Sequence, residues 1–306
     1  MTQPRIAVAP LDAPEHVCQA IHDGGGRLVD AADADGLVWT DPHGPHGLRD
    51  LLDEHPTIRW VQLPWAGVEA FAAAGVMDGG RLWTSGKGMY AEPVAEHALA
   101  LGLAGMREMK RYARASSWEE EAGISLVRGR VTIFGGGGIA RHLVRLLEPF
   151  ECHVTVIRRR PDDIPGADNV IGFDRRYEAL KGADVVFLTH ALTDETAGTI
   201  GSVELELMEP HSWLVNVARG EHVVTEDLVV ALREDVIGGA ALDVTEPEPL
   251  PEGHPLWELP NCLITPHVAN TEDMAQPLLA GRIAENVRRF AEGKDLLGPV
   301  HVELGY

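Results

Sequence analysis

The chain has 306 residues, a length that suggests two domains, and its 45% hydrophobic and 24% charged residues are typical of a globular protein and exclude wholesale disorder. Its 26 Lys and Arg residues against 47 Asp and Glu residues give a formal net charge of -21. Such a surface repels phosphates, so we expect no binding to nucleic acid or to an anionic membrane, although a local basic pocket remains compatible with it.

The chain shows neither a signal peptide nor a stretch approaching the roughly 18 apolar residues of a membrane span. Cys18, Cys152 and Cys262 are scattered and odd in number, which favours free thiols in a reduced compartment over disulfides or a zinc site. His43 and His46 have no cysteine or carboxylate at ligand spacing, so we interpret them as a polar loop and predict no metal. The expectation is a cytoplasmic enzyme.

In the first third of the chain, short apolar runs alternate with helical segments, which is typical of a parallel sheet covered by helices. A helix is predicted over residues 48–55, where Pro56 ends it, and a long apolar helix over 93–112, with Pro93 in its first turn. The predicted strands are residues 5–9, 37–40, 58–63 and 81–84.

A second alternating series follows, with helices predicted at 138–147 and 225–234. The last helix, over 272–292, is amphipathic and is expected to pack on the first domain. The predicted strands are residues 131–134, 153–157, 184–189, 213–217, 238–242 and 262–265.

These elements predict an α/β fold made of two doubly wound parallel-sheet domains. One domain would comprise residues 1–100 plus 283–306, and the other would comprise residues 101–282. Two long helices would run between the domains and leave a cleft, which is a common location for a ligand site.

A glycine-rich turn follows the strand at 131–134 and has the pattern G-x-G-x-x-A from Gly135 to Ala140. Gly135 permits the tight turn, Gly137 lets the backbone approach a pyrophosphate, and the small Ala140 lets helix and strand pack closely. At the start of the following helix, Gly138 and Ile139 offer backbone N–H groups to anionic oxygens. A flexible turn is the alternative, but the strand before and the helix after favour a dinucleotide site.

The strand at 153–157 ends in Arg158, Arg159 and Arg160, where an acidic residue would bind the ribose hydroxyls of NAD. Guanidinium groups bind a 2′-phosphate in a bidentate manner, so this triplet predicts NADP as the preferred cofactor, with NAD as the second possibility. The alternative is a solvated surface triplet.

Three polar side chains, Arg219, Glu248 and His267, each come after a strand of the second series. Ligands of open α/β sheets bind at the carboxyl ends of the strands, so we expect these side chains to converge on one site. Each residue also has a structural alternative: a strand-end arginine, an acidic loop bounded by prolines, or a histidine bonded to backbone.

The motifs NVARG (216–220), ALDVTEPEPLP (241–251) and PLWELPNCLITPH (255–267), with the glycine turn upstream, resemble the D-isomer-specific 2-hydroxyacid dehydrogenase family. The resemblance extends over nearly the whole chain and implies a flavodoxin-like substrate domain and a Rossmann NAD(P)-binding domain. It implies that Arg219 binds the substrate carboxylate and polarises the carbonyl, that His267 is the general acid/base, and that Glu248 supports His267.

These residue types suit the implied reaction. A guanidinium fork can address a carboxylate and the adjacent carbonyl together. Hydride addition builds an alkoxide that needs a proton, which an imidazole supplies near neutral pH and a nearby carboxylate helps it to carry. Glu248 is preferred to Glu246 because the family's acid lies five positions after the aspartate Asp243 and directly before a proline.

The resemblance also assigns further residues to ligands. On the cofactor side, Asp243 would either accept from the nicotinamide carboxamide or cap a turn at the start of its loop, while His190, Ala218 and His267 would border the cofactor. On the substrate side, Ala66 and Gly67 would offer backbone N–H groups to the carboxylate. Lys87 would either add positive charge to the pocket or lie in solvent, and Trp65 and Tyr90 would either line the pocket or belong to the core.

The function expected from this resemblance is NAD(P)-dependent reduction of a small 2-keto acid, closest in kind to the glyoxylate/hydroxypyruvate reductases. A phosphoglycerate dehydrogenase-like oxidoreductase and a catalytically silent NAD(P)-sensing protein are the alternatives. Residues 115–118 resemble the arm through which family members pair, so we expect a homodimer through the nucleotide-binding domain, with Trp118 buried at the interface.

Overall fold

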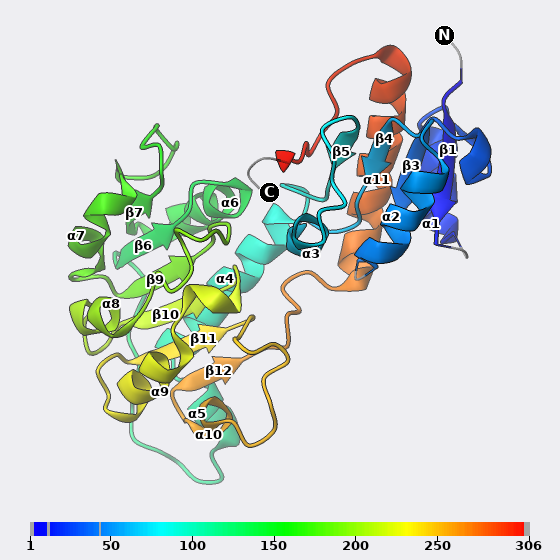
Figure 1. Cartoon of the computed structure of the whole chain (residues 1–306). Helices are drawn as coiled ribbons and strands as arrows, with labels where there is room; N and C mark the ends of the chain where they lie inside the picture. Colours follow the sequence, from blue (N-terminus) through cyan, green and yellow to red (C-terminus); the bar gives the residue numbers. More distant parts are fainter. Residues whose placement is uncertain (1–2, 11–12, 43, 303–306) are drawn as a thin grey trace. The chain divides into compact units, whose positions relative to one another are not determined.

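The computed structural model describes residues 3–10, 13–42 and 44–302, so His43 of the predicted polar loop lies outside the described residues. The chain divides into two compact units: the first runs to Tyr90 and resumes at Thr271, and the second is Ala91–Asn270. Each unit is built on a sheet whose labelled strands pair in parallel, which confirms the predicted fold class (Figure 1). Within the described ranges, no helix combines the length and the apolar character needed to cross a bilayer.

The division falls at the starts of two helices, α4 (Ala91–Met106) and α11 (Glu272–Glu292). The boundaries expected from the sequence, after residues 100 and 282, lie inside these helices. Each helix stays with one unit because its buried face packs along a single core: Ala95 and Leu101 of α4 in the second unit, and Ile283 of α11 in the first.

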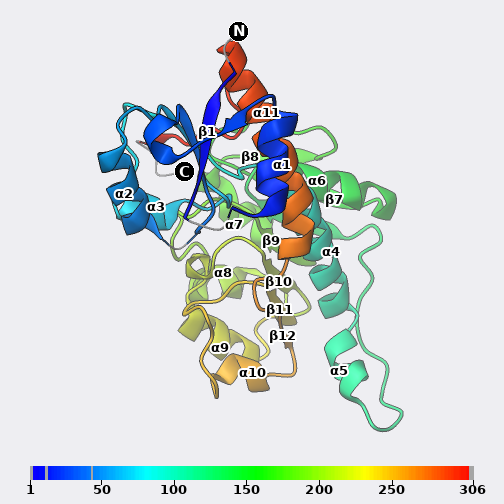
Figure 2. The same ribbon diagram turned by 90° about the vertical axis from the view of Figure 1, so that its right-hand side faces the viewer.

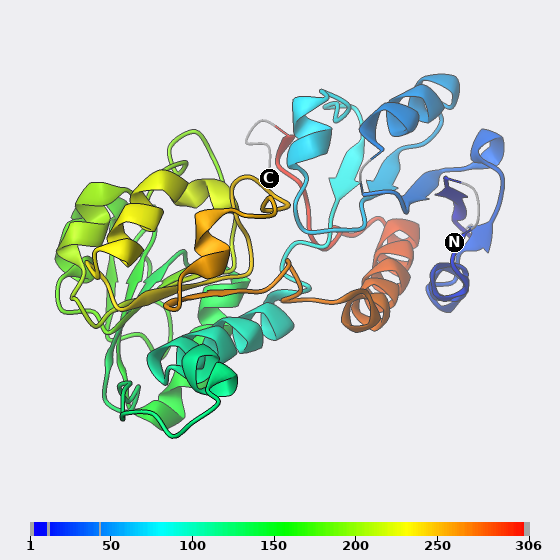
Figure 3. The ribbon, with the colours of Figure 1, turned by 90° about the horizontal axis from the view of Figure 1, so that it is seen from below.

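In the first unit, helices cover both faces of a sheet of order β2-β1-β3-β4-β5 (Figure 3). Helices α1 (Glu15–Asp23) and α11 lie on one face, and α2 (Pro45–Glu54) and α3 (Glu69–Ala73) lie on the other. The two-residue β2 was not predicted, because a strand that short has no readable alternation. The strands are β1 (Arg5–Ala9), β2 (Arg27–Leu28), β3 (Gly36–Trp39), β4 (Trp60–Gln62) and β5 (Leu82–Thr84).

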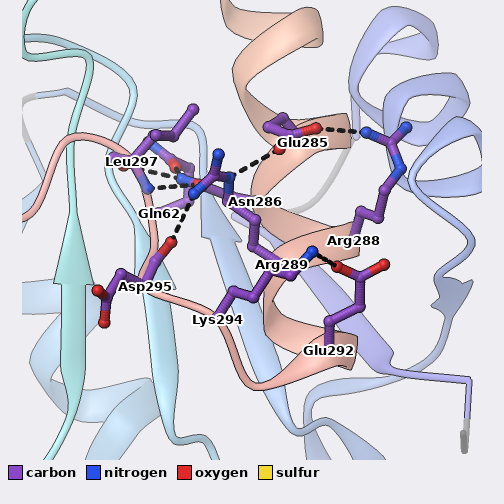
Figure 4. A network of polar contacts seen from close by, with 9 residues as sticks. All are labelled: Gln62, Glu285, Asn286, Arg288, Arg289, Glu292, Lys294, Asp295 and Leu297. Carbon is purple, nitrogen blue, oxygen red and sulfur yellow. Dashed lines mark hydrogen bonds and ion pairs between the residues drawn. The ribbon is translucent and has the colours of Figure 1, made fainter.

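A buried polar network ties α11 and the chain after it to β4 (Figure 4). Asn286 Nδ2 donates to Gln62 Oε1 and to the Leu297 carbonyl, both at 3.0 Å, and the Leu297 N–H donates to Asn286 Oδ1 at 2.8 Å. Gln62 Oε1 also accepts from Thr84 Oγ1 at 2.9 Å. Because Gln62 and Asn286 are fully buried, these bonds hold the C-terminal segment firmly, and Pro299 then pairs with Thr84 at the sheet edge.

The second unit contains a sheet of order β12-β11-β10-β9-β6-β7-β8. Helices α4 and α6 (Gly138–Leu147) cover one face, while α7 (Arg176–Leu180), α8 (Ser202–Leu207) and α9 (Thr225–Arg233) cover the other (Figures 1 and 2). The strands are β6 (Arg130–Phe134), β7 (His153–Ile157), β8 (Asn169–Ile171), β9 (Val185–Leu188), β10 (Trp213–Asn216), β11 (Gly239–Leu242) and β12 (Cys262–Ile264).

The prediction of one continuous helix over 93–112 is wrong. Helix α4 ends at Met106, and a separate helix, α5 (Met109–Arg114), begins after Glu108, whose φ of 53° is left-handed. The Ile124 N–H donates to the Met106 carbonyl at 2.8 Å, which is the acceptor that a continuing helix would need. The chain returning from beyond α5 therefore competes with the helix and ends it.

Candidate active site

The glycine-rich turn connects β6 to α6 and leaves room for a ligand. Gly135 has a φ of 107°, and a Cβ there would lie 2.9 Å from Thr189 Oγ1 and 3.0 Å from the His190 N atom, so only glycine fits. A Cβ on Gly137 would meet nothing within 4 Å, so this side of the turn is open. Gly137 also provides no side-chain cap to α6, whose first N–H groups remain suited to an anion. These residues fit a dinucleotide pyrophosphate.

The arginine triplet follows β7 beside this turn. Arg158 lies against Gly136, where a Cβ would come 2.7 Å from Arg158 Cδ, and its guanidinium is 3.8 Å from the Asp162 carboxylate. Arg159 and Arg160 are exposed. A cationic side chain, that of Arg158, therefore borders the glycine turn in a chain that is strongly acidic overall.

His267, which follows β12, forms a close pair with Glu248, which lies in the loop after β11. The His267 Nδ1 atom lies 2.7 Å from Glu248 Oε1, and both side chains are partly exposed, at 53% and 42%. Since Nδ1 faces the carboxylate, Nε2 is the ring nitrogen left to exchange a proton with a ligand. The backbone of His267 is left-handed, with a φ of 52°, and its N–H donates to the Asp243 carbonyl at 2.8 Å and to the Thr265 carbonyl at 3.0 Å.

Asp243 is buried and holds the segment that carries His267. Its Oδ1 accepts from Thr265 Oγ1 at 2.6 Å and from the Val268 N–H at 2.9 Å, and its Oδ2 accepts from the Ala269 N–H at 3.0 Å. His97 Nε2 lies 3.3 Å from Oδ1. Burial opposes ionisation, but the bonds from His97, Thr265 and the backbone outweigh it, and the pKa of Asp243 lies below its usual range.

A turn-capping role was the alternative expected for Asp243, and its bonds from the Val268 and Ala269 N–H groups fit that alternative. The contact between His97 and Asp243 was not predicted. The groups that contact the Asp243 carboxylate come from residue 97 and from residues 265–269. No spacing in the sequence indicates that these groups meet. The expected bond from Asp243 to a nicotinamide carboxamide stays a prediction.

Arg219 follows β10 and its backbone is held on both sides. Asn216 Oδ1 accepts from the Ala218 N–H at 3.0 Å, and Asn216 Nδ2 donates to the Arg219 carbonyl at 2.8 Å. A Cβ on Gly220 would overlap the backbone of Thr245, so the segment after Arg219 packs directly on the loop that leads to Glu248. The structure therefore brings the segments of Arg219 and Glu248 together within the second unit.

In the first unit, the two predicted substrate loops are bonded to each other after β4 and β5. The Gly86 N–H donates to the Trp65 carbonyl at 2.9 Å, and the Tyr90 hydroxyl donates to the Pro64 carbonyl at 2.8 Å. Tyr90 is buried, and its ring packs on Trp65 with centroids 5.6 Å apart, so Tyr90 belongs to the packing of these loops.

The residues proposed for the substrate lie on the outer parts of these loops. Ala66 is exposed and Gly67 is partly exposed, and Lys87 is exposed on the second loop. Partial desolvation lowers the pKa of Lys87. Among the described residues, no group of three or more His, Cys, Asp and Glu side chains is arranged to hold a metal ion.

Comparisons with known proteins identify the family to which the chain is similar. The model of the D-isomer specific 2-hydroxyacid dehydrogenase family, NAD binding domain, matches residues 97–269. An uncharacterised protein of Corynebacterium melassecola is 36% identical and covers 94% of this chain and 95% of its own. A glyoxylate/hydroxypyruvate reductase A of Serratia proteamaculans is 30% identical over 96% of this chain and 93% of its own.

A solved structure has the same fold throughout. The D-isomer specific 2-hydroxyacid dehydrogenase of Xanthobacter autotrophicus Py2, in complex with NADPH and MES, superposes with a TM-score of 0.86 and 26% identity, covering both chains completely. The glycine turn fits the cofactor that the matched domain binds, which is NAD or NADP. This chain therefore belongs to the D-isomer specific 2-hydroxyacid dehydrogenase family and is an NAD(P)-dependent oxidoreductase.

Proposed function

We propose that the enzyme reduces a short 2-keto acid, of the glyoxylate or hydroxypyruvate type, to the D-2-hydroxy acid with NADPH as the preferred donor. The observation that carries this proposal is the pairing of His267 Nδ1 with Glu248 Oε1 at 2.7 Å, which leaves the opposite ring nitrogen for proton transfer. The similarity to a glyoxylate/hydroxypyruvate reductase A over nearly the whole chain supports the substrate class.

The nucleotide-binding role is proposed for the second unit. Backbone N–H groups at Gly137, Gly138 and Ile139 would hold the pyrophosphate, with Gly135 making the turn, and the nicotinamide supplies a hydride when bound. His190, which abuts Gly135, would lie beneath the cofactor, and Ala218 would border it. The substrate-binding role is proposed for the first unit, where Ala66 and Gly67 would donate backbone N–H groups to the carboxylate.

Three side chains of the second unit would carry the reaction. The Arg219 guanidinium binds the substrate carboxylate and draws electron density from the neighbouring carbonyl oxygen. As the carbonyl carbon receives a hydride, its oxygen gains negative charge and takes the proton from His267 Nε2. Glu248 keeps the second proton of His267 on Nδ1 and stabilises the positive charge of the imidazolium before that transfer. Hydride and proton together reduce the C=O group to a secondary alcohol, or to a primary one when glyoxylate is the substrate.

Arg158 and Arg159 would set the preference for NADP by pairing with its 2′-phosphate. Turnover of glyoxylate and hydroxypyruvate should show a kcat/KM with NADPH at least about tenfold above that with NADH, since one charge-assisted pair contributes about 1.5–3 kcal/mol. The double variant Arg158→Ser, Arg159→Ser should lose this preference by weakening NADPH only. Arg175→Ser, which removes a surface arginine paired with Glu178, is the matched control and should behave as the wild type.

Two outcomes of that experiment would contradict the proposal. Absence of turnover with every member of a panel of 2-keto acids would remove the reductase function. Turnover with equal efficiency for both cofactors, unaffected by the double variant, would leave the reductase but remove the proposed role of the arginines.

We also propose a homodimer formed through the second unit. Helix α5 and the chain after it extend away from the sheet of this unit (Figure 2), and they expose large apolar side chains: Trp118 at 100%, Met109 at 56% and Val127 at 46%. Burial of these side chains against a second copy would remove apolar surface from water. Light scattering at micromolar concentration should give the mass of a dimer, and Trp118→Ser should shift the mass toward the monomer.

A monomeric mass for the wild type would contradict the dimer. The control is Val203→Ser, because Val203 is also exposed, at 55%, but lies on α8, which covers the face of the sheet opposite to α4. A cytoplasmic location is proposed as well, supported by the free state of Cys18, Cys152 and Cys262.

A further inference from the structure

His222 is a fully buried polar side chain that lies three residues after Arg219, at the end of the short helix η4 (Gly220–His222). Burial lowers the pKa of its imidazole, so the ring is neutral near pH 7. No sequence motif assigns a role to His222, and the proposed reaction does not use it. A buried imidazole beside the substrate-binding arginine needs a physical account, because burying a polar ring costs free energy unless its nitrogens are hydrogen-bonded.

The Nδ1 atom of His222 lies close to two backbone atoms of Arg219, 3.2 Å from the amide nitrogen and 3.1 Å from the carbonyl oxygen. That carbonyl already accepts from Asn216 Nδ2 at 2.8 Å and from the His222 N–H at 3.3 Å, and these two bonds occupy its two lone pairs. The Arg219 N–H, in contrast, is a donor directed at Nδ1. Nε2 of His222 is buried and has no hydrogen-bond partner among the described residues, so the tautomer is inferred from the Nδ1 side alone. Because the Arg219 N–H is directed at Nδ1, Nδ1 is assigned as the acceptor and the ring proton to Nε2.

The other side of the His222 ring packs on His190. The two ring centroids are 4.0 Å apart, and burial together with the neighbouring His222 lowers the pKa of His190 to about 3, so both rings are neutral. His190 belongs to the loop that abuts Gly135 of the glycine turn. The His222 ring thus contacts His190 in the segment beside the cofactor turn, at an interplanar angle of 45°, and its Nδ1 contacts the backbone of Arg219.

We propose that His222 is a positioning residue of the 2-keto acid site, which acts by accepting the backbone N–H of Arg219 on Nδ1 and so fixing the point from which the guanidinium extends. This inference rests on the proposed role of Arg219 in binding the substrate carboxylate. Asn216 fixes the carbonyl of Arg219 and His222 fixes its amide, so the residue is held at both ends of its backbone. Misplacement of a binding group by even a small distance weakens substrate binding.

Three substitutions at this position separate the hydrogen bond from the packing. His222→Phe keeps a ring against His190 but removes the acceptor. His222→Asn places an acceptor oxygen where Nδ1 lies, while His222→Gln places its polar atoms further out, near the position of Nε2. We expect the KM for glyoxylate to rise about tenfold in the Phe and Gln variants and to stay within about threefold of the wild type in the Asn variant.

Further readouts distinguish positioning from general structural support. In the Phe and Gln variants kcat should change by less than about threefold and the Kd for NADPH by less than about twofold, because only binding through Arg219 is weakened. The exposed His211, which pairs with Asp184, supplies the control His211→Asn, which should leave all constants unchanged. Equal KM values in the Asn and Phe variants, or losses that follow only a lower melting temperature, would overturn the inference.

A measurement on the unsubstituted enzyme keeps the inference testable if the variants fold poorly. In protein labelled with ¹⁵N-histidine, NMR should assign His222 to the neutral tautomer with its proton on Nε2, and a proton on Nδ1 would overturn the inference. Failure of the proposed function is recognised separately. If Arg219→Ala leaves the KM for glyoxylate unchanged, the substrate role of Arg219 is wrong, whatever the tautomer of His222.

Discussion

Replacement of His267 by asparagine should lower kcat for 2-keto acid reduction by about 10²- to 10⁴-fold, the range that general acid catalysis contributes. Asparagine is chosen because it tolerates the left-handed backbone that His267 adopts, with a φ of 52°, so the loop can keep its shape. The bonds from Val268 and Ala269 to Asp243 do not involve the imidazole and should persist. Single-turnover stopped-flow measurement of NADPH oxidation isolates the chemical step.

Binding of the cofactor provides the control for this substitution. The Kd for NADPH should stay within about twofold of the wild type, because the glycine turn that would hold the pyrophosphate belongs to the segment between β6 and α6. A single-turnover rate within about tenfold of the wild type would contradict the role of His267 as the proton donor.

Glu248 and Glu246, two glutamates of the same loop, provide a matched pair of substitutions that tests which carboxylate supports His267. Glu248→Gln removes the charge 2.7 Å from His267 Nδ1 and should lower kcat by about ten- to a hundredfold. Glu246 is exposed two residues earlier, and Glu246→Gln should leave kcat unchanged. The reverse order of effects would transfer the supporting role to Glu246.

The parts of the fold that follow from local patterns could be predicted from the sequence. Strand β7, helix α6 and helix α11 have the predicted limits, because apolar periodicity and flanking glycine or proline residues determine where such elements begin and end. The break between α4 and α5 could not be predicted. It depends on the bond from Ile124 to Met106, whose donor lies in a segment with no regular structure.

The candidate site also contains residues that could be predicted from the sequence and contacts that could not. Arg219, Glu248 and His267 were identified because each follows a strand in a motif of the family, and the short distance between His267 and Glu248 agrees with that expectation. His222 was not identified, and for Asp243 a turn-capping role was only one of two expectations. The bonds from Ala269 to Asp243 and from Arg219 to His222 use backbone groups that every sequence possesses, so no pattern indicates them. Only the folded chain shows which side chain reaches which N–H group.

Substitution of Arg219 by alanine should lower kcat/KM for glyoxylate by about 30- to 5000-fold, which corresponds to the roughly 2–5 kcal/mol lost when one partner of a hydrogen-bonded charge pair is removed. The backbone bonds of Arg219 to Asn216 and His222 should persist, because they do not use the guanidinium, whereas the bond from Nη1 to the Ala218 carbonyl at 2.7 Å is lost. Arg219→Lys keeps the charge but loses the planar fork, so it should recover only part of the activity. Steady-state kinetics with both variants, with Arg233→Ala at the end of α9 as the control, provide the measurement.

The substrate itself provides the sharper comparison. Glycolaldehyde has a carbonyl but no carboxylate, so the wild type should strongly prefer glyoxylate, and Arg219→Ala should lose most of this preference because its loss applies mainly to the carboxylate-bearing substrate. Added guanidinium ion should partly restore turnover of glyoxylate by the alanine variant, since it can occupy the vacated position and bind the carboxylate. Equal losses of kcat/KM for both substrates would mean that Arg219 acts on the carbonyl or on the fold and does not bind the carboxylate. Recognition of the carboxylate would then have to be assigned to the loops of the first unit.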